Sequence, residues 1–275
     1  MTSRTDKKAQ RRADPLTRER IAEAAVELLD TAGERGLTFP ALSERLSTGP
    51  GAIYWHVSDK NDLLGAATEA VIGTALPARP APSPSSQPQP QPQREPQREQ
   101  VHAVALALYD AIEAHPWLPA QLAAQLSRNP WGPVTARIFE GISRQVIALN
   151  VPAHSWFTAT SALMHYILGA AAQNAANTAS ARDLGPDVSR ASFFESVAQA
   201  WQELDPHTYP SARAVAGQLG DHDDREQFLA GIDLILAGFA ATYPAATERT
   251  PSATERTAPW PPHRPDRPPH RPDSR

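Results

Sequence analysis

Residues 38–64, TFPALSERLSTGPGAIYWHVSDKNDLL, contain the most specific pattern in the chain. We expect a short helix over 40–46, because Thr38 can cap it and a first helical turn tolerates proline. Residues 47–49 then form a turn, and Pro50 can begin a second helix with an apolar inner side and polar or aromatic outer groups. Such a pair is typical of a helix-turn-helix, whose second helix enters the major groove of DNA.

An amphipathic helix is predicted before this segment. Thr17 can cap it, and Ile21, Ala25 and Leu29 form an apolar stripe at helical spacing. Gly33 is expected to end the helix. This helix would support the helix-turn-helix and would not read bases itself.

Residues 16–64 resemble the DNA-binding domain of the TetR family of transcriptional repressors, in the branch that includes the tetracycline repressors. The matching pieces are LTRERIAEAAVELLDTAG, GLTFPALSERL, GAIYWHV and a further helix that starts at Ser58-Asp59-Lys60. Their order and spacing make the match more specific than a single helix-turn-helix pattern.

The DNA contacts follow from the helix-turn-helix and from this resemblance. Residues 50–52 are expected at base edges, where their lack of hydrogen-bonding side chains favours contact with thymine methyl groups and readout of DNA shape. The resemblance implies that Tyr54 and His56 contact phosphates or bases and that Lys60 lies beside a phosphate. Core packing is the alternative for Tyr54 and Trp55. The predicted DNA-binding residues are Thr38, Pro50, Gly51, Ala52, Tyr54, Trp55, His56 and Lys60.

The charge of the chain is not that of a typical nucleic-acid binder. The formal net charge is −4 over 275 residues, so a basic footprint is absent overall. Residues 1–20 nevertheless contain seven Lys and Arg against three Asp and Glu. We expect 1–15 to be a flexible basic arm that adds salt-dependent affinity for DNA. A solvated terminus without a partner is the alternative.

Two proline-rich blocks divide the sequence. We expect a connecting helix over 65–76, a disordered Pro/Gln-rich insertion over 77–100 and a disordered Pro-rich tail over 244–275, because these blocks offer no apolar face. No run of eighteen apolar residues and no signal peptide is present, so we expect a soluble, cytoplasmic protein without a membrane partner. Cysteine is absent, which excludes disulfides and thiolate metal sites.

Residues 101–243 have the periodicity of helices throughout, and no strand pattern competes. Helices are predicted over 101–115, 117–126, 134–149, 153–178, 189–204 and 225–243. The predicted fold class is therefore all-α, with an N-terminal three-helix helix-turn-helix domain and a C-terminal helical domain. The family resemblance implies that this C-terminal domain serves ligand binding and dimerisation.

The C-terminal half also resembles tetracycline-repressor-type proteins, chiefly in SALMHYILGA (161–170) and FLAGIDLILAGFA (228–240). The resemblance implies that the helices 153–178 and 225–243 pair with their counterparts in a homodimer. Two reading heads one DNA turn apart would then recognise a palindromic operator. Burial of the last helix within one subunit is the alternative.

A small-molecule inducer is implied by the same resemblance. The predicted ligand-binding residues are Trp117, Trp131, Trp156, Phe157, His165, Tyr166, Asn174 and Trp201. Each of them can instead be a core residue, and a satisfied core histidine is the alternative for His165. The positions that correspond to the magnesium ligands of tetracycline repressors are Leu122 and Gln173, which are poor magnesium ligands. We therefore expect no metal and no cofactor.

The sequence as a whole predicts a ligand-responsive repressor that is not an enzyme. It contains no GxSxG, GxxxxGK or HExxH pattern and no catalytic cysteine. Two alternatives stay open: an all-helical enzyme, and an interaction scaffold whose helix-turn-helix is only structural.

Overall fold

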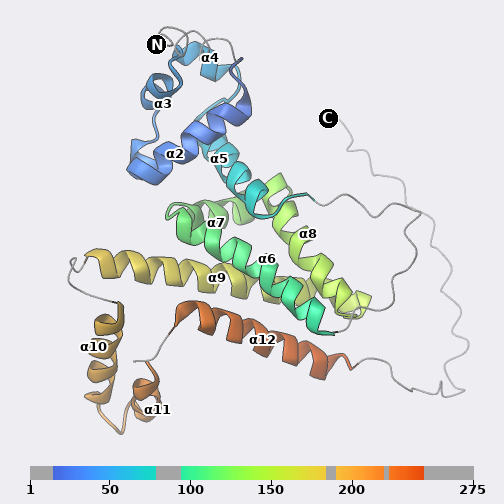
Figure 1. Ribbon diagram of the computed structural model, residues 1–275, viewed down its shortest axis with the longest axis vertical. Helices are drawn as coiled ribbons and strands as arrows, with labels where there is room; N and C mark the ends of the chain where they lie inside the picture. The colour runs from blue at the N-terminus through green and yellow to red at the C-terminus, as the bar shows by residue number, and fades with distance from the viewer. Residues whose placement is uncertain (1–14, 79–93, 184–189, 220–222, 245–275) are drawn as a thin grey trace, which may run out of the picture. The chain divides into compact units, whose positions relative to one another are not determined.

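Every regular element that a computed structural model of the chain describes is a helix (Figure 1). The described residues are 15–78, 94–183, 190–219 and 223–244. This confirms the predicted all-α class. All but the last residue of the predicted arm over 1–15, all but the first residue of the tail over 244–275 and most of the insertion over 77–100 lie outside the described residues.

The N-terminal helices begin at the caps that the sequence predicts. The Thr17 hydroxyl accepts a hydrogen bond of 3.3 Å from the Arg20 N–H, and the Thr38 hydroxyl accepts one of 3.3 Å from the Ala41 N–H. Asp59 caps the next long helix in the same way. The helices are α2 (Arg18–Gly36), α3 (Phe39–Leu46), α4 (Pro50–Tyr54) and α5 (Lys60–Ala75).

A buried cluster holds α3 and α4 against α2. Leu42 of α3 and Ile53 of α4 are fully buried, and they belong to the same cluster as Ile21 and Leu29 of α2. Gly33 interrupts α2 near the predicted end, because its φ of +64° lies in the region that favours glycine. The helical segment continues beyond this interruption to Gly36.

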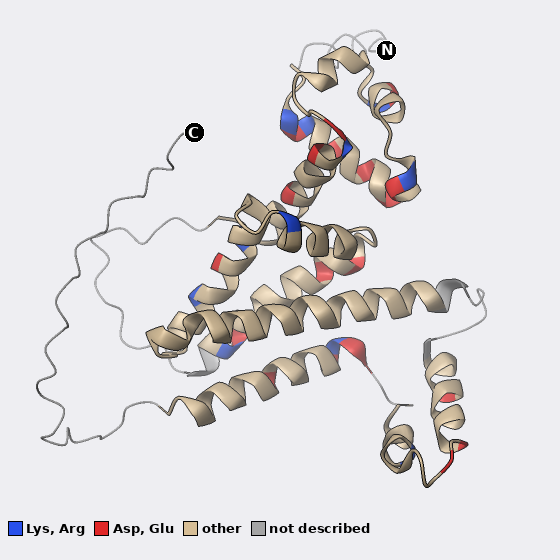
Figure 2. Ribbon diagram, turned by 180° about the vertical axis from the view of Figure 1, so that it is seen from behind, with Lys and Arg blue, Asp and Glu red and all other residues tan. Residues whose placement is uncertain are grey.

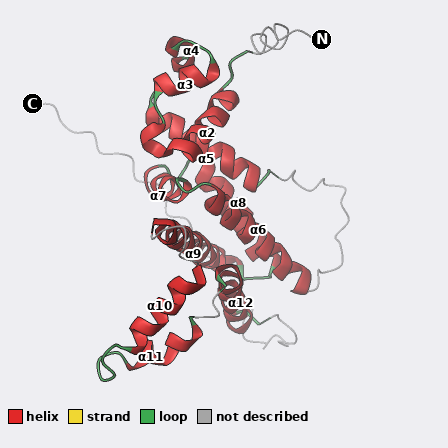
Figure 3. Cartoon of the chain, turned by 60° about the vertical axis from the view of Figure 1, so that its left-hand side comes forward, coloured by secondary structure: helices red, strands yellow, loops and turns green. Residues whose placement is uncertain are grey.

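The remaining helices form the C-terminal half of the described chain. They are α6 (Arg94–Ala114), α7 (Leu118–Arg128), α8 (Pro133–Ala148), η1 (Ala153–Ser155), α9 (Trp156–Asp183), α10 (Arg190–Gln202), α11 (Pro210–Val215), η2 (Ala216–Gln218) and α12 (Asp224–Thr242). The short elements α11 and η2 are additional to the predicted helices. Figure 3 shows them beside α10.

The start of α6 corrects one predicted boundary. Residues 94–100 were expected to belong to the disordered insertion, but they are helical. Tertiary contacts explain the difference, because Gln97 is buried and Arg98 forms an ion pair with Asp233 of α12. Pro96 lies within the first turn of α6, where proline is tolerated.

Aromatic packing joins α12 to α6 and α9. The ring of Phe228 is buried, and its centroid lies 4.9 Å from that of Tyr109 on α6 and 6.0 Å from that of Tyr166 on α9. The Tyr166 hydroxyl donates a 3.1 Å hydrogen bond to the Phe228 carbonyl. His102 of α6 adds a polar contact to Asp233, with 2.8 Å between Nε2 and Oδ1.

Asp30 of α2 links the helix-turn-helix to the C-terminal helices. Its Oδ1 lies 2.7 Å from Nδ1 of His115 and accepts a 2.7 Å hydrogen bond from Nε1 of Trp117. Residues of α5 pack against α6, α7 and α8. The helix-turn-helix is therefore joined to the rest of the described chain through both α2 and α5.

We expect replacement of Phe228 by alanine to lower the free energy of unfolding by about 3 to 5 kcal/mol, because it removes a buried ring and leaves a cavity. The exposed neighbour Gln227 is the matched control, and Gln227→Ala should stay within about 0.5 kcal/mol of the wild type. Urea unfolding followed by circular dichroism measures both. Equal stability of the two variants would contradict this assignment of the core.

Candidate DNA-reading surface and effector cavity

The exposed side of α4 and its C-cap residue Trp55 present aromatic side chains. Ile53 is fully buried, whereas Tyr54 is 53% exposed and Trp55 is 90% exposed. The inward position of Ile53 therefore turns its neighbours outward on the short helix. For Trp55 this exposure excludes the alternative of core packing within the subunit.

Tyr54 is held in place by a stacked ring. The centroids of Tyr54 and Phe39 are 4.4 Å apart, with 20° between the ring planes. Phe39 is half-buried at the start of α3, so it connects this aromatic surface to the core. Stacking of this kind limits the motion of the tyrosine ring before any ligand or nucleic acid binds.

The segment that precedes these aromatic residues is exposed and has no charged side chain. Residues 49–52 are all exposed, and a Cβ added at Gly49 or Gly51 would meet no atom within 4 Å. Close approach of another backbone is therefore possible here. Thr38 is also exposed, and its hydroxyl caps α3.

His56 and Lys60 are more enclosed than the aromatic pair. Both are half-buried, and the His56 carbonyl accepts a 2.7 Å hydrogen bond from Nη1 of Arg18. The Nζ of Lys60 donates a 2.6 Å hydrogen bond to the carbonyl of Glu34 at the end of α2. If Lys60 contacts a phosphate, its ammonium group must share or give up the hydrogen bond to Glu34. The phosphate contact therefore stays a prediction.

An ion pair fixes the turn between α4 and α5. Nη2 of Arg18 lies 2.5 Å from Oδ1 of Asp62, and the Ser58 N–H donates a 2.9 Å hydrogen bond to Oδ2. The hydrogen bond from Arg18 holds the pKa of the Asp62 carboxyl below its ordinary value, against the opposing effect of burial. The same hydrogen bond raises the pKa of Arg18. The aromatic surface is thus attached to α2 by a charge-assisted contact.

Acidic residues outnumber basic ones in the domain that carries the aromatic surface. Residues 15–78 contain five Lys and Arg against nine Asp and Glu. Figure 2 shows no charged residue on α4. Arg45 of α3 forms an ion pair with Glu27 of α2. The folded helix-turn-helix therefore lacks the basic patch that usually attracts DNA.

The predicted ligand-binding residues do not converge on one site. Trp131 and Phe157 are 83% and 73% exposed. His165 is exposed on α9, so within the subunit it is not a core histidine. Trp201 lies on α10 and is 37% exposed.

The other predicted ligand-binding residues mostly have structural partners. Trp117 is buried and binds Asp30. Trp156 donates a 2.6 Å hydrogen bond from Nε1 to the Val151 carbonyl. Tyr166 packs on Phe228, and burial raises the pKa of its hydroxyl. Asn174 is half-buried on α9.

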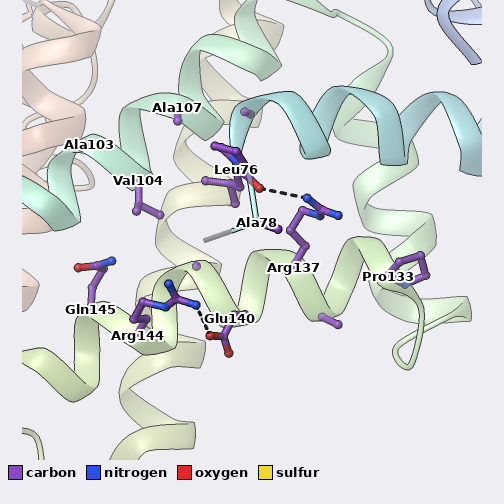
Figure 4. Close-up of a pocket in the computed structure, with 14 residues that line it drawn as sticks. Leu76, Ala78, Ala103, Val104, Ala107, Pro133, Arg137, Glu140, Arg144 and Gln145 are labelled. Carbon is purple, nitrogen blue, oxygen red and sulfur yellow. Dashed lines mark hydrogen bonds and ion pairs between the residues drawn. The ribbon is translucent and has the colours of Figure 1, made fainter. Parts of the chain in front are cut away.

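A cavity of about 570 Å³ lies elsewhere, between the end of α5, α6 and α8 (Figure 4). Its volume suits a small organic molecule. None of the predicted ligand-binding residues lines it. The lining residues that matter below are Leu76, Val104, Arg137, Glu140, Gly141 and Arg144. In the sequence, the charged residues of α8 have the spacing of a solvated helix face, so the pattern alone gave no sign of a cavity.

A second cavity, of about 510 Å³, lies between α2, α5 and α6. His115, Glu23 and Glu27 line it together with Val71. It does not contain the predicted ligand-binding residues either.

Leu122 and Gln173 correspond to the magnesium ligands of tetracycline repressors, and they lie in different environments in this structure. Leu122 is buried in the core, and Gln173 is exposed and donates a 2.9 Å hydrogen bond to Asn177. No group of three or more His, Cys, Asp or Glu residues that could hold a metal ion occurs in the described part of the chain. None of the helices described is long and apolar enough to cross a membrane.

Family models match both halves of the chain. Residues 21–67 match the model of bacterial regulatory proteins of the tetR family, and residues 89–243 match the tetracycline repressor-like C-terminal domain. The chain therefore belongs to the TetR family of DNA-binding transcriptional regulators, as the sequence predicts.

Individual proteins agree with this assignment. The solved structure of the transcriptional regulator SCO7222, a TetR from Streptomyces coelicolor, is 58% identical and has a TM-score of 0.69, with 82% of this chain and 99% of that chain covered. A helix-turn-helix transcriptional regulator of Saccharopolyspora erythraea is 32% identical over 163 residues, which span 58% of this chain and 62% of that relative. Streptomyces coelicolor ActR in complex with actinorhodin shares the fold, at 23% identity and a TM-score of 0.65 over 84% of this chain and 99% of that chain.

The Asp62 ion pair leads to a pH-dependent prediction. Because the pKa of Asp62 is lower in the folded protein, its stabilising effect is fully present above the ordinary carboxyl pKa of about 4 and is lost as the pH falls below it. We expect Asp62→Asn to destabilise the protein by about 1 kcal/mol at pH 7, a value reduced for the partial exposure of both side chains.

Urea unfolding at pH 7 and at about pH 3 tests this, because the difference between wild type and variant should shrink at the lower pH. Glu44→Gln is the control, since Glu44 is an exposed acidic residue of the same domain. A difference for Asp62→Asn that does not change with pH would contradict the assigned role.

Proposed function

We propose that the protein is a homodimeric repressor that binds a palindromic operator through α4 and is released from it by a small molecule. The observation that carries the proposal is the aromatic surface of α4, where Trp55 is 90% exposed although its neighbour Ile53 is fully buried. An exposed tryptophan on the reading helix of a TetR-family chain has no role in folding the subunit. Contact with DNA would give this tryptophan a function. The proposed place of action is the cytoplasm.

Readout by this surface would rely on shape and apolar contact. Residues 50–52 have no side-chain hydrogen-bonding groups, which favours close backbone approach and contact with thymine methyl groups. Tyr54, fixed by Phe39, and the exposed Trp55 would lie beside the sugar-phosphate backbone or base edges. His56 and Lys60 would complete the contact at its edge.

The faces of α9 and α12 support a homodimer. Ala162, His165 and Gly169 are exposed on one face of α9. On α12, Leu234 is 75% exposed, and the exposed Gly238 follows one turn later. A Cβ at Gly169 or Gly238 would meet no atom within 4 Å, so packing within the subunit does not require glycine at these positions. Close packing of these helices against a second copy of the chain would require it.

The ligand response would act through α5. A molecule in the cavity beside Leu76 contacts the end of the helix whose other end is fixed to the helix-turn-helix by Arg18. A ligand that binds one position of α5 better than another shifts the population toward the first. When α5 shifts, the distance between the two α4 helices of the dimer changes, and the affinity for the operator falls.

Two substitutions test the reading surface. Selection of bound duplexes from a random pool first supplies an operator and shows whether its half-sites are palindromic. We then expect Trp55→Ala and Tyr54→Ala each to weaken operator binding by about tenfold, because each removes a contact at the DNA. Fluorescence anisotropy of labelled duplex measures the affinity.

Trp131→Ala is the matched control, because Trp131 is 83% exposed but lies between α7 and α8. It should leave operator affinity unchanged. Failure to select any duplex would overturn the proposal and favour a scaffold, or an enzyme if turnover of a metabolite were found. Unchanged affinity in both α4 variants would reject only the assigned contacts.

The dimer has a separate test. We expect Leu234→Glu and Gly238→Glu to convert the dimer into folded monomers, because each places a charge in the proposed contact between copies. Ala123→Glu on α7 is the control, since Ala123 is exposed on a different helix. Analytical ultracentrifugation reports the mass, and a monomeric wild type at micromolar concentration would contradict the proposed interface.

A further inference from the structure

We propose that the cavity between α5, α6 and α8 binds an amphipathic anion, with an apolar body and one carboxylate group, and that this carboxylate takes Arg137 away from the end of α5. The inference rests on the proposed function, because it names the class of effector and its mode of action. It is carried by the chemistry of α8 and by one hydrogen bond.

The cavity has an apolar side and a charged side. Leu76 from the end of α5 and Val104 and Ala107 from α6 provide apolar surface. The charged groups all come from α8, and Figure 4 shows Arg137, Glu140 and Arg144 along the side of the cavity that this helix forms. A ligand that fills both sides must combine an apolar body with a polar group.

The charges on α8 are not balanced. Arg144 forms a 2.8 Å ion pair with Glu140 one turn earlier. For Arg137, no carboxylate lies within ion-pair distance among the described residues. The cavity therefore carries one excess positive charge at a half-buried guanidinium. An anion satisfies this group better than a neutral ligand, because charge-assisted hydrogen bonds are the stronger ones.

Arg137 makes only one long hydrogen bond to the rest of the described chain. Its Nη1 donates a hydrogen bond of 3.4 Å to the carbonyl of Leu76, the residue that ends α5. A guanidinium has several N–H donors, and a single long bond to a neutral carbonyl leaves most of them for a ligand. A carboxylate in the cavity accepts in the paired, planar geometry that arginine favours.

This weak bond lies where it can affect α5. The last turn of α5 contains no basic residue of its own, and Nη1 of Arg137 lies 3.8 Å from the position of a Cβ at Gly73. Arg137 therefore supplies positive charge to the negative end of the helix dipole. When a carboxylate binds Arg137, the end of α5 loses this partner, and the helix is free to move toward its induced position.

Fluorescent probes of matched shape test the ligand class. The anion is 1-pyrenebutyrate and the neutral control is 1-pyrenebutanamide, each titrated into the full-length dimer without DNA. We expect the wild type to bind the anion about tenfold more tightly than the amide, the difference that one charge-assisted contact provides. Arg137→Gln should abolish this preference, while Arg128→Gln, at an exposed arginine at the end of α7, should retain it.

Each outcome decides the inference. Equal affinity of the wild type for the two probes, absence of binding by both, or an unchanged preference in Arg137→Gln would overturn it. Circular dichroism checks the fold of the variants. If Arg137→Gln does not fold, Arg137→Lys is used, which keeps the charge without the planar fork and should reduce the preference to a few-fold.

The second part of the proposal, release of DNA through Arg137, is tested on the selected operator. At equal occupancy of the cavity, pyrenebutyrate should release the duplex from the wild type and the amide should not. Release by both probes alike would overturn the role of Arg137. If no operator is found but the anion preference is present, the proposed function fails and the ligand class stands. If an operator is bound but the preference is absent, the inference fails and the proposed function stands.

Discussion

Each end of α5 is held by a guanidinium from another helix, and this constraint ties the reading surface to the cavity. Arg18 binds Asp62 and the carbonyl of His56 at the first end, while Arg137 binds the carbonyl of Leu76 at the second. The helix between them is continuous and buries residues along most of its length. Because packed interiors resist deformation, the proposed shift at one end of α5 would be carried to the other end.

The two ends are unequal in strength. Arg18 and Asp62 form a charged pair at 2.5 Å, whereas Arg137 reaches a neutral carbonyl at 3.4 Å. In the proposed response, the end beside the cavity would therefore be the one that a competing ligand releases first. Asp30 makes a second connection through His115 and Trp117, so in the proposed response α2 would keep its contact with the C-terminal helices while α5 moves. The helix-turn-helix would then rotate about this contact.

Sequence reasoning succeeded where local chemistry determines the structure. Thr17 and Thr38 cap their helices because a side-chain oxygen beside a helix start accepts a free backbone N–H, a rule that needs no distant partner. It could not place residues that depend on packing. The exposure of Trp55 follows from the burial of Ile53 on a very short helix. The cavity is formed by three segments that lie far apart in the sequence, so a search for aromatic residues did not find its lining. The predicted contacts with DNA remain predictions.

The charge distribution separates two tasks in binding DNA. The described helix-turn-helix has an excess of acidic residues, and Arg18 and Arg45 are paired with carboxylates. If α4 reads the operator, its apolar and aromatic groups contribute affinity that depends little on salt. Attraction that depends on salt must then come from elsewhere. Residues 1–14 contain five Lys and Arg against two Asp and Glu, the one strongly basic segment near this domain in the sequence. Shape readout and long-range attraction would thus reside in different parts of the chain, which reconciles a net charge of −4 with binding to a polyanion.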